Sequence, residues 1–551
     1  MWSLLLSLAC ATAPVDNADT VLICAEQYIA TLQPWLQHRR AQGHEFAWIP
    51  NTGTRMEIRA AIRGTALSGK LRNIVIVGDA FSPDGQGDVS RELAVPTHFG
   101  KANVNVKWGS EPEIASDNWY ADLDDDQLPD LTVGRITADG NEDLETIVHK
   151  IIRYENAVPD GSWQRRINFV AGVGGFGVIA DSVLEMATKK FLTEGVPPSY
   201  LTSMTYGSWR SPYCPDPRRF HRATLERLNE GSLFWVYIGH GHRNTLDRVR
   251  IPGGGFHLFD KHDADKLVCS VGHPIAVLLA CYTGAYDAPE DCLAEEMLRA
   301  KGGPIAILAG SRVTMPYAMA VLGTEMMNEY FVQRRATLGE ILLHAKRRLA
   351  RQEDVEQFDS TGENADATRQ RRSNRQMLDQ LATVLSPSKK MLEEERREHL
   401  LLFNLIGDPL LRLPQAVDCE VFAEKEASSG ENIRVKLKCP LVGNCRIEVA
   451  CRRDTTRAPI PPRREFQFDA DSLLAYDEVY AFANDSVWSL YELDFPGGVL
   501  EVDVPIPPEA TGPGVIRMCV MGPDQFALGA TEVFFRRSKK PLDVNRDDAA
   551  R

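Results

Sequence analysis

The chain has 551 residues, a net charge of −14, 44% hydrophobic residues and 25% charged residues. This length exceeds what one hydrophobic core supports, so two or three domains are expected. The composition is that of an ordinary soluble globular protein. The acidic balance argues against a nucleic-acid-binding surface, which needs concentrated Lys and Arg, and no apolar run is long enough to span a membrane.

The N-terminus resembles a secretory signal. An apolar run at residues 4–8 is followed by small residues, although the usual basic start is missing. We expect a signal peptide over residues 1–17 and a secreted or cell-envelope protein, with a cytoplasmic location as the alternative. Export would allow one disulfide among Cys439, Cys445 and Cys451, whose spacing does not match a zinc site.

Apolar runs of strand length alternate with helical patterns through most of the chain. The expected strands are 20–24, 45–49, 73–79, 131–135, 167–171, 233–238, 275–280 and 304–308. The expected helices are 25–43, 56–68, 141–157, 179–194, 220–229 and 292–300. Residues 81–118 are rich in turn formers and are expected to form loops. Such alternation predicts an α/β fold, with a parallel sheet and right-handed crossovers.

Two of these strands end in a reactive side chain among small residues. The strand at 233–238 leads to His240 and Gly241, and the strand at 275–280 leads to Cys281. Ligands bind at the carboxyl ends of parallel strands, and a thiol beside an imidazole is the minimal unit for nucleophilic acyl transfer. Taken alone, the cysteine would be read as a small hydrophobe and the histidine as a turn residue. Only their matching positions point to catalysis.

The sequence changes character twice after residue 350. Residues 351–400 are dominated by charged and polar side chains, which predicts a charged helical insertion that is solvated and partly mobile. From about residue 416 the pattern turns to period two, which predicts a β-sandwich over 416–538. The polar residues 539–551 are expected to form a disordered tail.

An ordered set of motifs supports a family comparison. The segments are 73–79, ending in Gly-Asp; 116–120 with 130–135; Tyr-Ile-Gly-His-Gly at 237–241; Ala-Cys-Tyr-Thr-Gly at 280–284; and 403–409. Together they resemble the gingipain-type cysteine peptidases, family C25. The resemblance implies a caspase-like parallel-sheet sandwich with helices on both faces, followed by an immunoglobulin-like β-sandwich. It divides the core into an N-terminal α/β subdomain at 18–160 and a catalytic subdomain at 161–415.

The resemblance also assigns roles to individual residues. Cys281 is the expected nucleophile and His240 the general acid/base, with the backbone N–H groups of Gly241 and Cys281 as the oxyanion hole. His242 is expected to face solvent or a neighbouring loop. Asp181, at the start of the helix after the 167–171 strand, is the candidate that orients the histidine; the alternative is an ordinary helix cap.

The implied activity is that of a cysteine endopeptidase acting on peptide or protein substrates, with no cofactor required for catalysis. Ser311, Met315 and Tyr317 are expected to line the pocket for the residue preceding the cleaved bond. Two alternatives stay open: a binding or scaffold protein with a decayed site, and a thiol hydrolase or ligase acting on a non-peptide acyl group. The oligomeric state does not follow from the sequence.

A run of carboxylates precedes the strand at 131–135. Family members bind calcium, and alternate aspartates supply the oxygen ligands that this ion prefers. The run lacks the mid-loop glycine and the distant glutamate of an EF-hand, so an acidic surface turn is the alternative. The expected structural calcium ligands are Asp122, Asp124, Asp126 and Asp130.

Overall fold

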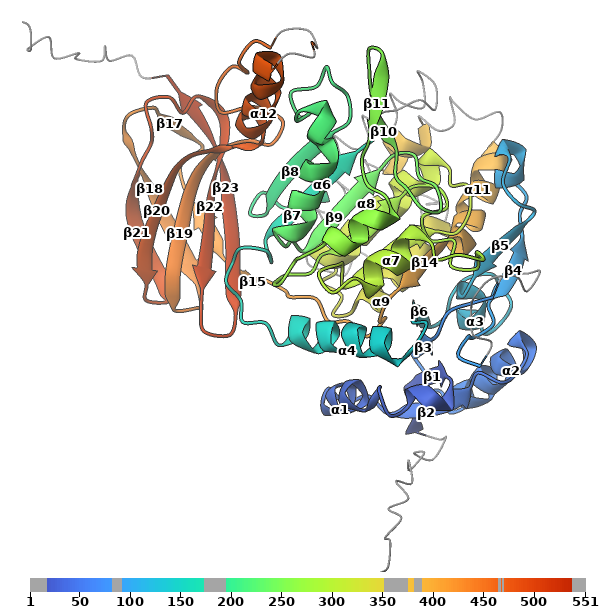
Figure 1. Ribbon diagram of the computed structural model, residues 1–551. Helices are drawn as coiled ribbons and strands as arrows, with labels where there is room; N and C mark the ends of the chain where they lie inside the picture. Colours follow the sequence, from blue (N-terminus) through green and yellow to red (C-terminus); the bar gives the residue numbers. More distant parts are fainter. Residues whose placement is uncertain are drawn as a thin grey trace, which may run out of the picture.

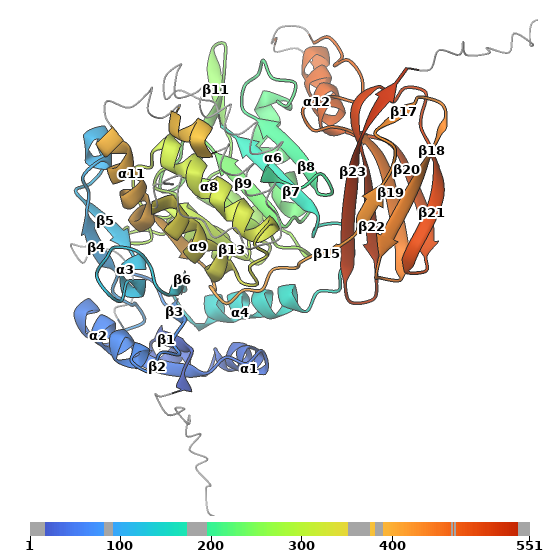
Figure 2. The ribbon, with the colours of Figure 1, turned by 180° about the vertical axis from the view of Figure 1, so that it is seen from behind.

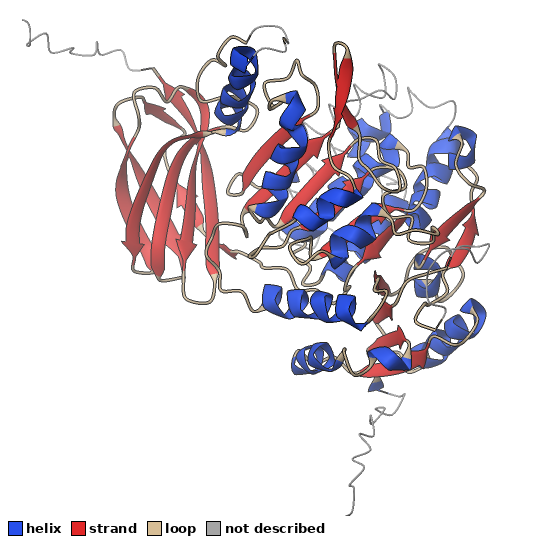
Figure 3. Ribbon diagram, viewed as in Figure 1, coloured by secondary structure: helices blue, strands red, loops and turns tan. Residues whose placement is uncertain are grey.

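The protein has two parts that lie side by side (Figures 1 and 3). One is an α/β part built on a large sheet, and the other, formed by residues after 416, consists mainly of β-strands. The structure is a computed structural model that describes residues 17–81, 92–172, 195–350, 375–380, 389–463, 467 and 470–537. The predicted α/β class and the C-terminal β-region are confirmed.

Ten strands form the main sheet. Several of them, such as β3, β9 and β12, are buried at every position, which explains their continuous apolar sequence. In spatial order the strands are β2 (Phe46–Pro50), β1 (Thr20–Cys24), β3 (Asn73–Val77), β6 (Thr132–Ile136), β14 (Phe403–Ile406), β13 (Ala306–Gly310), β12 (Ile275–Leu279), β9 (Phe234–Ile238), β7 (Arg166–Ala171) and β8 (Leu201–Tyr206).

The sheet consists of two parallel halves that run in opposite directions. All neighbours are parallel except β13 and β14, where Phe403 at the start of β14 faces Gly310 at the end of β13. The predicted parallel sheet is therefore correct within each half and wrong at this seam. Helices α8, α9 and α11 intervene between β13 and β14, and the local alternation of the sequence does not encode the direction in which the chain returns.

Helices cover both faces of the sheet. Helices α6 and α7 lie on the face seen in Figure 1, and α8, α9 and α11 on the face seen in Figure 2. The helices of the α/β part are α1 (Gln33–Ala41), α2 (Arg55–Ala66), α3 (Asn118–Ala121), α4 (Asn141–Glu155), α6 (Phe220–Asn229), α7 (Leu293–Arg299), α8 (Pro316–Phe331), α9 (Leu338–Ala350) and α11 (Lys389–Leu402). Among the described residues, no helix is long and apolar enough to cross a membrane.

In the described residues of the α/β part, two short hairpins lie outside the main sheet. The region 81–118, expected to be loops, contains the hairpin of β4 (His98–Lys101) and β5 (Glu113–Ser116). A second hairpin joins β10 (Arg248–Ile251) to β11 (Gly254–His257) and projects beyond the carboxyl end of β9 (Figure 1).

The charged segment 351–400 is not solvated throughout, and this part of the prediction is wrong. In α11 the side chains of Glu395, Glu398 and His399 are buried. Glu398 accepts hydrogen bonds from three consecutive backbone amides at 103–105, and Glu395 accepts one from the Ala318 amide at 3.1 Å. Buried charges are tolerated when they are hydrogen-bonded, and these donors come from distant loops. Residues 351–374 and 381–388 lie outside the described residues.

The C-terminal part is a β-sandwich of two sheets around a shared apolar core. The first sheet holds β15 (Val417–Asp418), β17 (Glu426–Ser428), β19 (Gly443–Cys451), β20 (Val487–Phe495), β22 (Gly512–Met521) and β23 (Phe526–Arg536). The second holds β16 (Glu420–Phe422), β18 (Asn432–Cys439) and β21 (Gly498–Pro505). A helix, α12 (Ala470–Asn484), links β19 to β20 and contacts β8.

The described cysteines are all free, so the disulfide considered among Cys439, Cys445 and Cys451 is not formed. Cys445 and Cys451 lie six residues apart on one strand, β19, a separation of roughly 20 Å that no disulfide spans. Cys439 lies on β18, in the opposite sheet.

Candidate active site

His240 and Cys281 lie at the ends of adjacent strands. Strands β9 and β12 are parallel neighbours, and their register pairs Ile238 with Leu279. Each reactive residue follows two positions later, so both reach the same edge of the sheet. The predicted adjacency of the two strands is confirmed.

Gly241 brings the loop that carries His240, called the histidine loop below, into contact with the loop that carries Cys281, called the cysteine loop. A methyl group in place of its hydrogen would lie 2.7 Å from the Cys281 carbonyl oxygen and 2.8 Å from the Ala280 side chain. In the described part of the chain, no backbone acceptor is recorded for the amides of Gly241 and Cys281. Close approach therefore requires glycine here, and two amide donors remain beside the thiol.

The buried Tyr237 holds the histidine loop in place through two hydrogen bonds. The Tyr237 hydroxyl donates to the His240 carbonyl oxygen at 2.7 Å and accepts from the Asp247 amide at 3.3 Å. Burial raises the pKa of the Asp247 carboxyl, while the nearby His240 acts in the opposite direction. Asp247 thus adds a carboxylate on the histidine side of the site, which sequence reasoning missed because it follows a turn with no recognisable motif.

The Cys281 thiol faces the backbone segment that follows β13, residues 311–315. The Thr314 amide lies 3.3 Å from Cys281 Sγ, and the Thr314 hydroxyl lies 3.6 Å from it. Tyr282, the next residue after the cysteine, has a φ of 59°, a left-handed conformation that is uncommon outside glycine. Such strain persists where the surrounding structure enforces it, and it is frequent at functional sites.

Glu111 contacts side chains from three loops around the thiol. It accepts from the Tyr282 hydroxyl at 2.7 Å and from Arg243 at 3.0 Å, and Arg312 lies 3.8 Å away. Hydrogen bonding and these cations hold the pKa of Glu111 below its usual value, against the effect of burial. Arg312 is held in turn by a bidentate pair with Asp287 at 2.8 and 2.6 Å. Nothing in the local sequence singles out Glu111.

The three residues expected to line a substrate pocket are each fixed by hydrogen bonds. The Ser311 hydroxyl is buried and donates to the Ala115 carbonyl oxygen at 2.8 Å. The Met315 amide donates to His399 at 2.9 Å, and the Tyr317 hydroxyl donates to Asp379 at 2.6 Å. These contacts hold the three residues in place, and the pocket role stays a prediction.

The remaining predicted residues differ in where they fall. His242 is exposed and begins a tight turn, with its amide donating to the Thr245 carbonyl oxygen at 2.8 Å. This agrees with the expectation that it faces solvent. Asp181 lies outside the described residues, so its role in orienting His240 stays a prediction.

The acidic run forms a compact loop. Carboxylate oxygens of Asp122, Asp124 and Asp130 come within 4.8 Å of one another. Asp126 instead accepts a hydrogen bond from the Leu128 amide at 2.7 Å. Arg347 lies 2.8 Å from Asp130, so cationic side chains already neutralise part of the loop. Three of the four predicted ligands therefore converge, and these oxygen donors suit a hard divalent cation.

Residues 13–414 match the model of peptidase family C25. The chain belongs to this family. Similar C25 proteins include gingipain R2 of Porphyromonas gingivalis, 24% identical over 328 residues, which is 58% of this chain and 40% of that protein. A Lys-gingipain of the same organism is 22% identical over 201 residues, 36% of this chain and 10% of that protein. The chain thus spans less than half the length of these relatives.

Solved structures confirm the fold. The crystal structure of the Arg-specific cysteine proteinase gingipain R matches with a TM-score of 0.51 at 16% identity, covering 95% of this chain and all of that one. A second structure, of a protease, matches with a TM-score of 0.52 at 13% identity and covers 95% and 98% of the two chains. The structural match thus extends across the C-terminal part, beyond the residues that the family model covers.

Proposed function

We propose that this C25 protein is a cysteine endopeptidase with Cys281 as nucleophile and His240 as general acid/base. The observation that carries the proposal is the register of β9 and β12, which brings a thiol and an imidazole to one edge of the sheet. Gly241 closes the distance between the two loops. The family membership supports the same reaction class.

In the proposed reaction the Cys281 thiolate attacks the carbonyl carbon of the scissile bond. The amides of Gly241 and Cys281 stabilise the negative charge that develops on the carbonyl oxygen. The carbon–nitrogen bond breaks as the imidazolium of His240 protonates the leaving amine, which leaves a thioester. Water, deprotonated by the neutral imidazole, then attacks the thioester, releases the acid and restores the thiol.

Active-site labelling tests this proposal. A peptidyl acyloxymethyl ketone should alkylate Cys281 in the full chain, and mass spectrometry should locate the adduct. His240→Ala should lower the rate of peptide cleavage by roughly 10²–10⁴-fold. The matched control is Cys269→Ala, which removes a buried thiol outside the site and should retain activity.

Other outcomes would identify the alternatives. An unlabelled Cys281 in a folded protein would favour the scaffold with a decayed site. Labelling without cleavage of any peptide would favour a thiol hydrolase or ligase on another acyl group. Cleavage by Cys281→Ala at the wild-type rate would refute the assignment.

We also propose that the loop of Asp122, Asp124 and Asp130 binds a structural calcium ion. The convergence of three carboxylates supports this, and the loop leads directly into β6. The ion would relieve carboxylate repulsion and take no part in the chemistry. Export, proposed from the signal-like residues 1–17, is tested by sequencing the N-terminus of the protein isolated from its native cells.

A further inference from the structure

A pocket of about 860 Å³ opens beside the histidine loop. It lies between the hairpin of β10 and β11 and the residues that follow the hairpin, and it includes His242 and Asp247 from the loop itself. Gly241, which touches Cys281, immediately precedes His242. The pocket therefore begins next to the dyad, on the side of the imidazole.

Two arginines face this pocket because of the alternation along β10. Val249 and Ile251 are buried, so Arg248 and Arg250 lie on the opposite, exposed face of the strand. Both arginines line the pocket. The cross-strand partner of Arg250 is Gly255, which has no side chain to cover the guanidinium.

The charge of these arginines is not neutralised by the described part of the chain, where neither has a carboxylate within ion-pair distance. Other cations of the region are paired: Lys261 lies 3.3 Å from Glu290. Asp247 is near enough for Arg250 to affect its ionisation, but its Oδ1 accepts from the Arg248 amide at 2.7 Å.

The position of the pocket defines which part of a substrate reaches it. The imidazole of His240 must contact the leaving amine, so the peptide on the C-terminal side of the scissile bond passes the histidine loop. Carboxylates are the natural partners of arginine, which binds them through two parallel hydrogen bonds.

We propose that this pocket binds acidic side chains on the C-terminal side of the cleaved bond, so that the enzyme selects peptides with Asp or Glu there. The proposal rests on the proposed peptidase function and adds a substrate class to it. Arg248 and Arg250 supply the positive charge, and Gly255, which has no side chain, leaves room for the substrate carboxylate.

Cleavage of paired peptides tests the selection. Peptides that differ only by Glu or Gln on the C-terminal side should be cleaved with kcat/KM values at least about 10-fold apart, since a hydrogen bond to a charged group contributes this much. Arg248→Gln/Arg250→Gln should abolish the difference by lowering cleavage of the Glu peptide to the level of the Gln peptide. The control Arg434→Gln/Arg446→Gln removes the same charge from exposed positions on the sandwich and should change neither rate.

A binding measurement separates the two proposals. Fluorescence anisotropy of a labelled glutamate-rich peptide should show binding to full-length Cys281→Ala, and the added Arg248→Gln/Arg250→Gln changes should remove it. If binding depends on these arginines but the wild-type protein cleaves no peptide, the peptidase is refuted and the pocket is supported. Equal cleavage of the Glu and Gln peptides, or a preference confined to the N-terminal side of the bond, would overturn the inference.

Discussion

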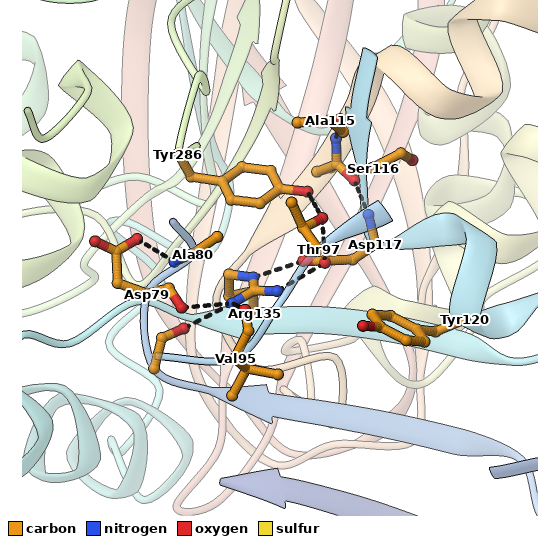
Figure 4. A network of polar contacts seen from close by, with 12 residues as sticks. Asp79, Ala80, Val95, Thr97, Ala115, Ser116, Asp117, Tyr120, Arg135 and Tyr286 are labelled. Carbon is orange, nitrogen blue, oxygen red and sulfur yellow. Dashed lines mark hydrogen bonds and ion pairs between the residues drawn. The ribbon is translucent and has the colours of Figure 1, made fainter. Parts of the chain in front are cut away.

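The ion pair of Arg135 and Asp117 lies beside the junction of β6 and β14, and its removal should destabilise the α/β part strongly. Arg135 pairs with Ile406 in the single register contact between β6 and β14. Its guanidinium donates to Asp117 at 2.7 and 2.8 Å, and both side chains are buried (Figure 4). The same guanidinium donates to the carbonyl oxygens of Gly78, Asp79 and Val95.

Asp117→Asn preserves the shape of the side chain and removes the negative charge. Burial lowers the pKa of Arg135 and the Asp117 carboxylate raises it. Because the ordinary pKa of a guanidinium lies far above neutral pH, the arginine stays charged in the variant. An uncompensated buried charge costs about 3–5 kcal/mol of the free energy of unfolding. The Thr97 hydroxyl, which donates to Asp117 at 2.9 Å, keeps an acceptor.

Urea unfolding followed by tryptophan fluorescence measures this loss. The matched control is Glu226→Gln, which breaks the exposed pair with Arg222 on α6, 2.9 Å long in the same part of the protein. That pair should contribute less than about 1 kcal/mol. A loss for Asp117→Asn no larger than that of Glu226→Gln would refute the argument that burial decides the magnitude.

Three further predictions concern the active-site contact, a buried acid and the acidic loop. Gly241→Ala should lower kcat/KM about 100-fold by displacing the histidine loop, whereas Gly64→Ala, with open space around it, should not. Burial raises the pKa of Asp79 to about 6 and that of its neighbour Glu295 well above its usual value, so the free energy of unfolding should fall as pH rises above about 4; Asp79→Asn should make this fall shallower in urea midpoints. Millimolar calcium should raise the Tm, and Asp124→Asn should abolish that increase while Asp126→Asn, outside the cluster, retains it.

The sequence predicts the strands and the joint placement of Cys281 and His240 at strand ends because both depend on local patterns. Helix α6 has the predicted bounds, Phe220–Asn229, and β9 and β12 are the predicted apolar runs. Their adjacency is shown by the register of the two strands, and the rule that ligands bind at the carboxyl ends of strands made their two end residues candidates. Local periodicity and the ordered set of family motifs were sufficient for this part.

Features that depend on distant partners were not predictable. Glu398 is buried because three amides from residues 103–105 reach it, and no local pattern records those donors. The direction of β14 and the contacts of Thr314 and Glu111 with the cysteine loop also depend on where separate segments meet. The hairpin of β10 and β11 was missed for a different reason, because its short strands and glycines give no clear period.

The sandwich is physically continuous with the catalytic part, although its sequence reads as a separate unit. Glu448 on β19 lies 2.7 Å from Arg165, just before β7, and 3.0 Å from Arg517 on β22, and all three side chains are buried. Leu528 of β23 belongs to the same apolar cluster as the main sheet. Removing the sandwich would expose that apolar surface and leave Arg165 without its carboxylate, and both changes would destabilise the catalytic part. The period-two pattern of the sequence does not reveal this dependence. The sandwich therefore packs against the β7–β8 edge of the main sheet. Strand β7 is the neighbour of β9, and β9 leads to His240.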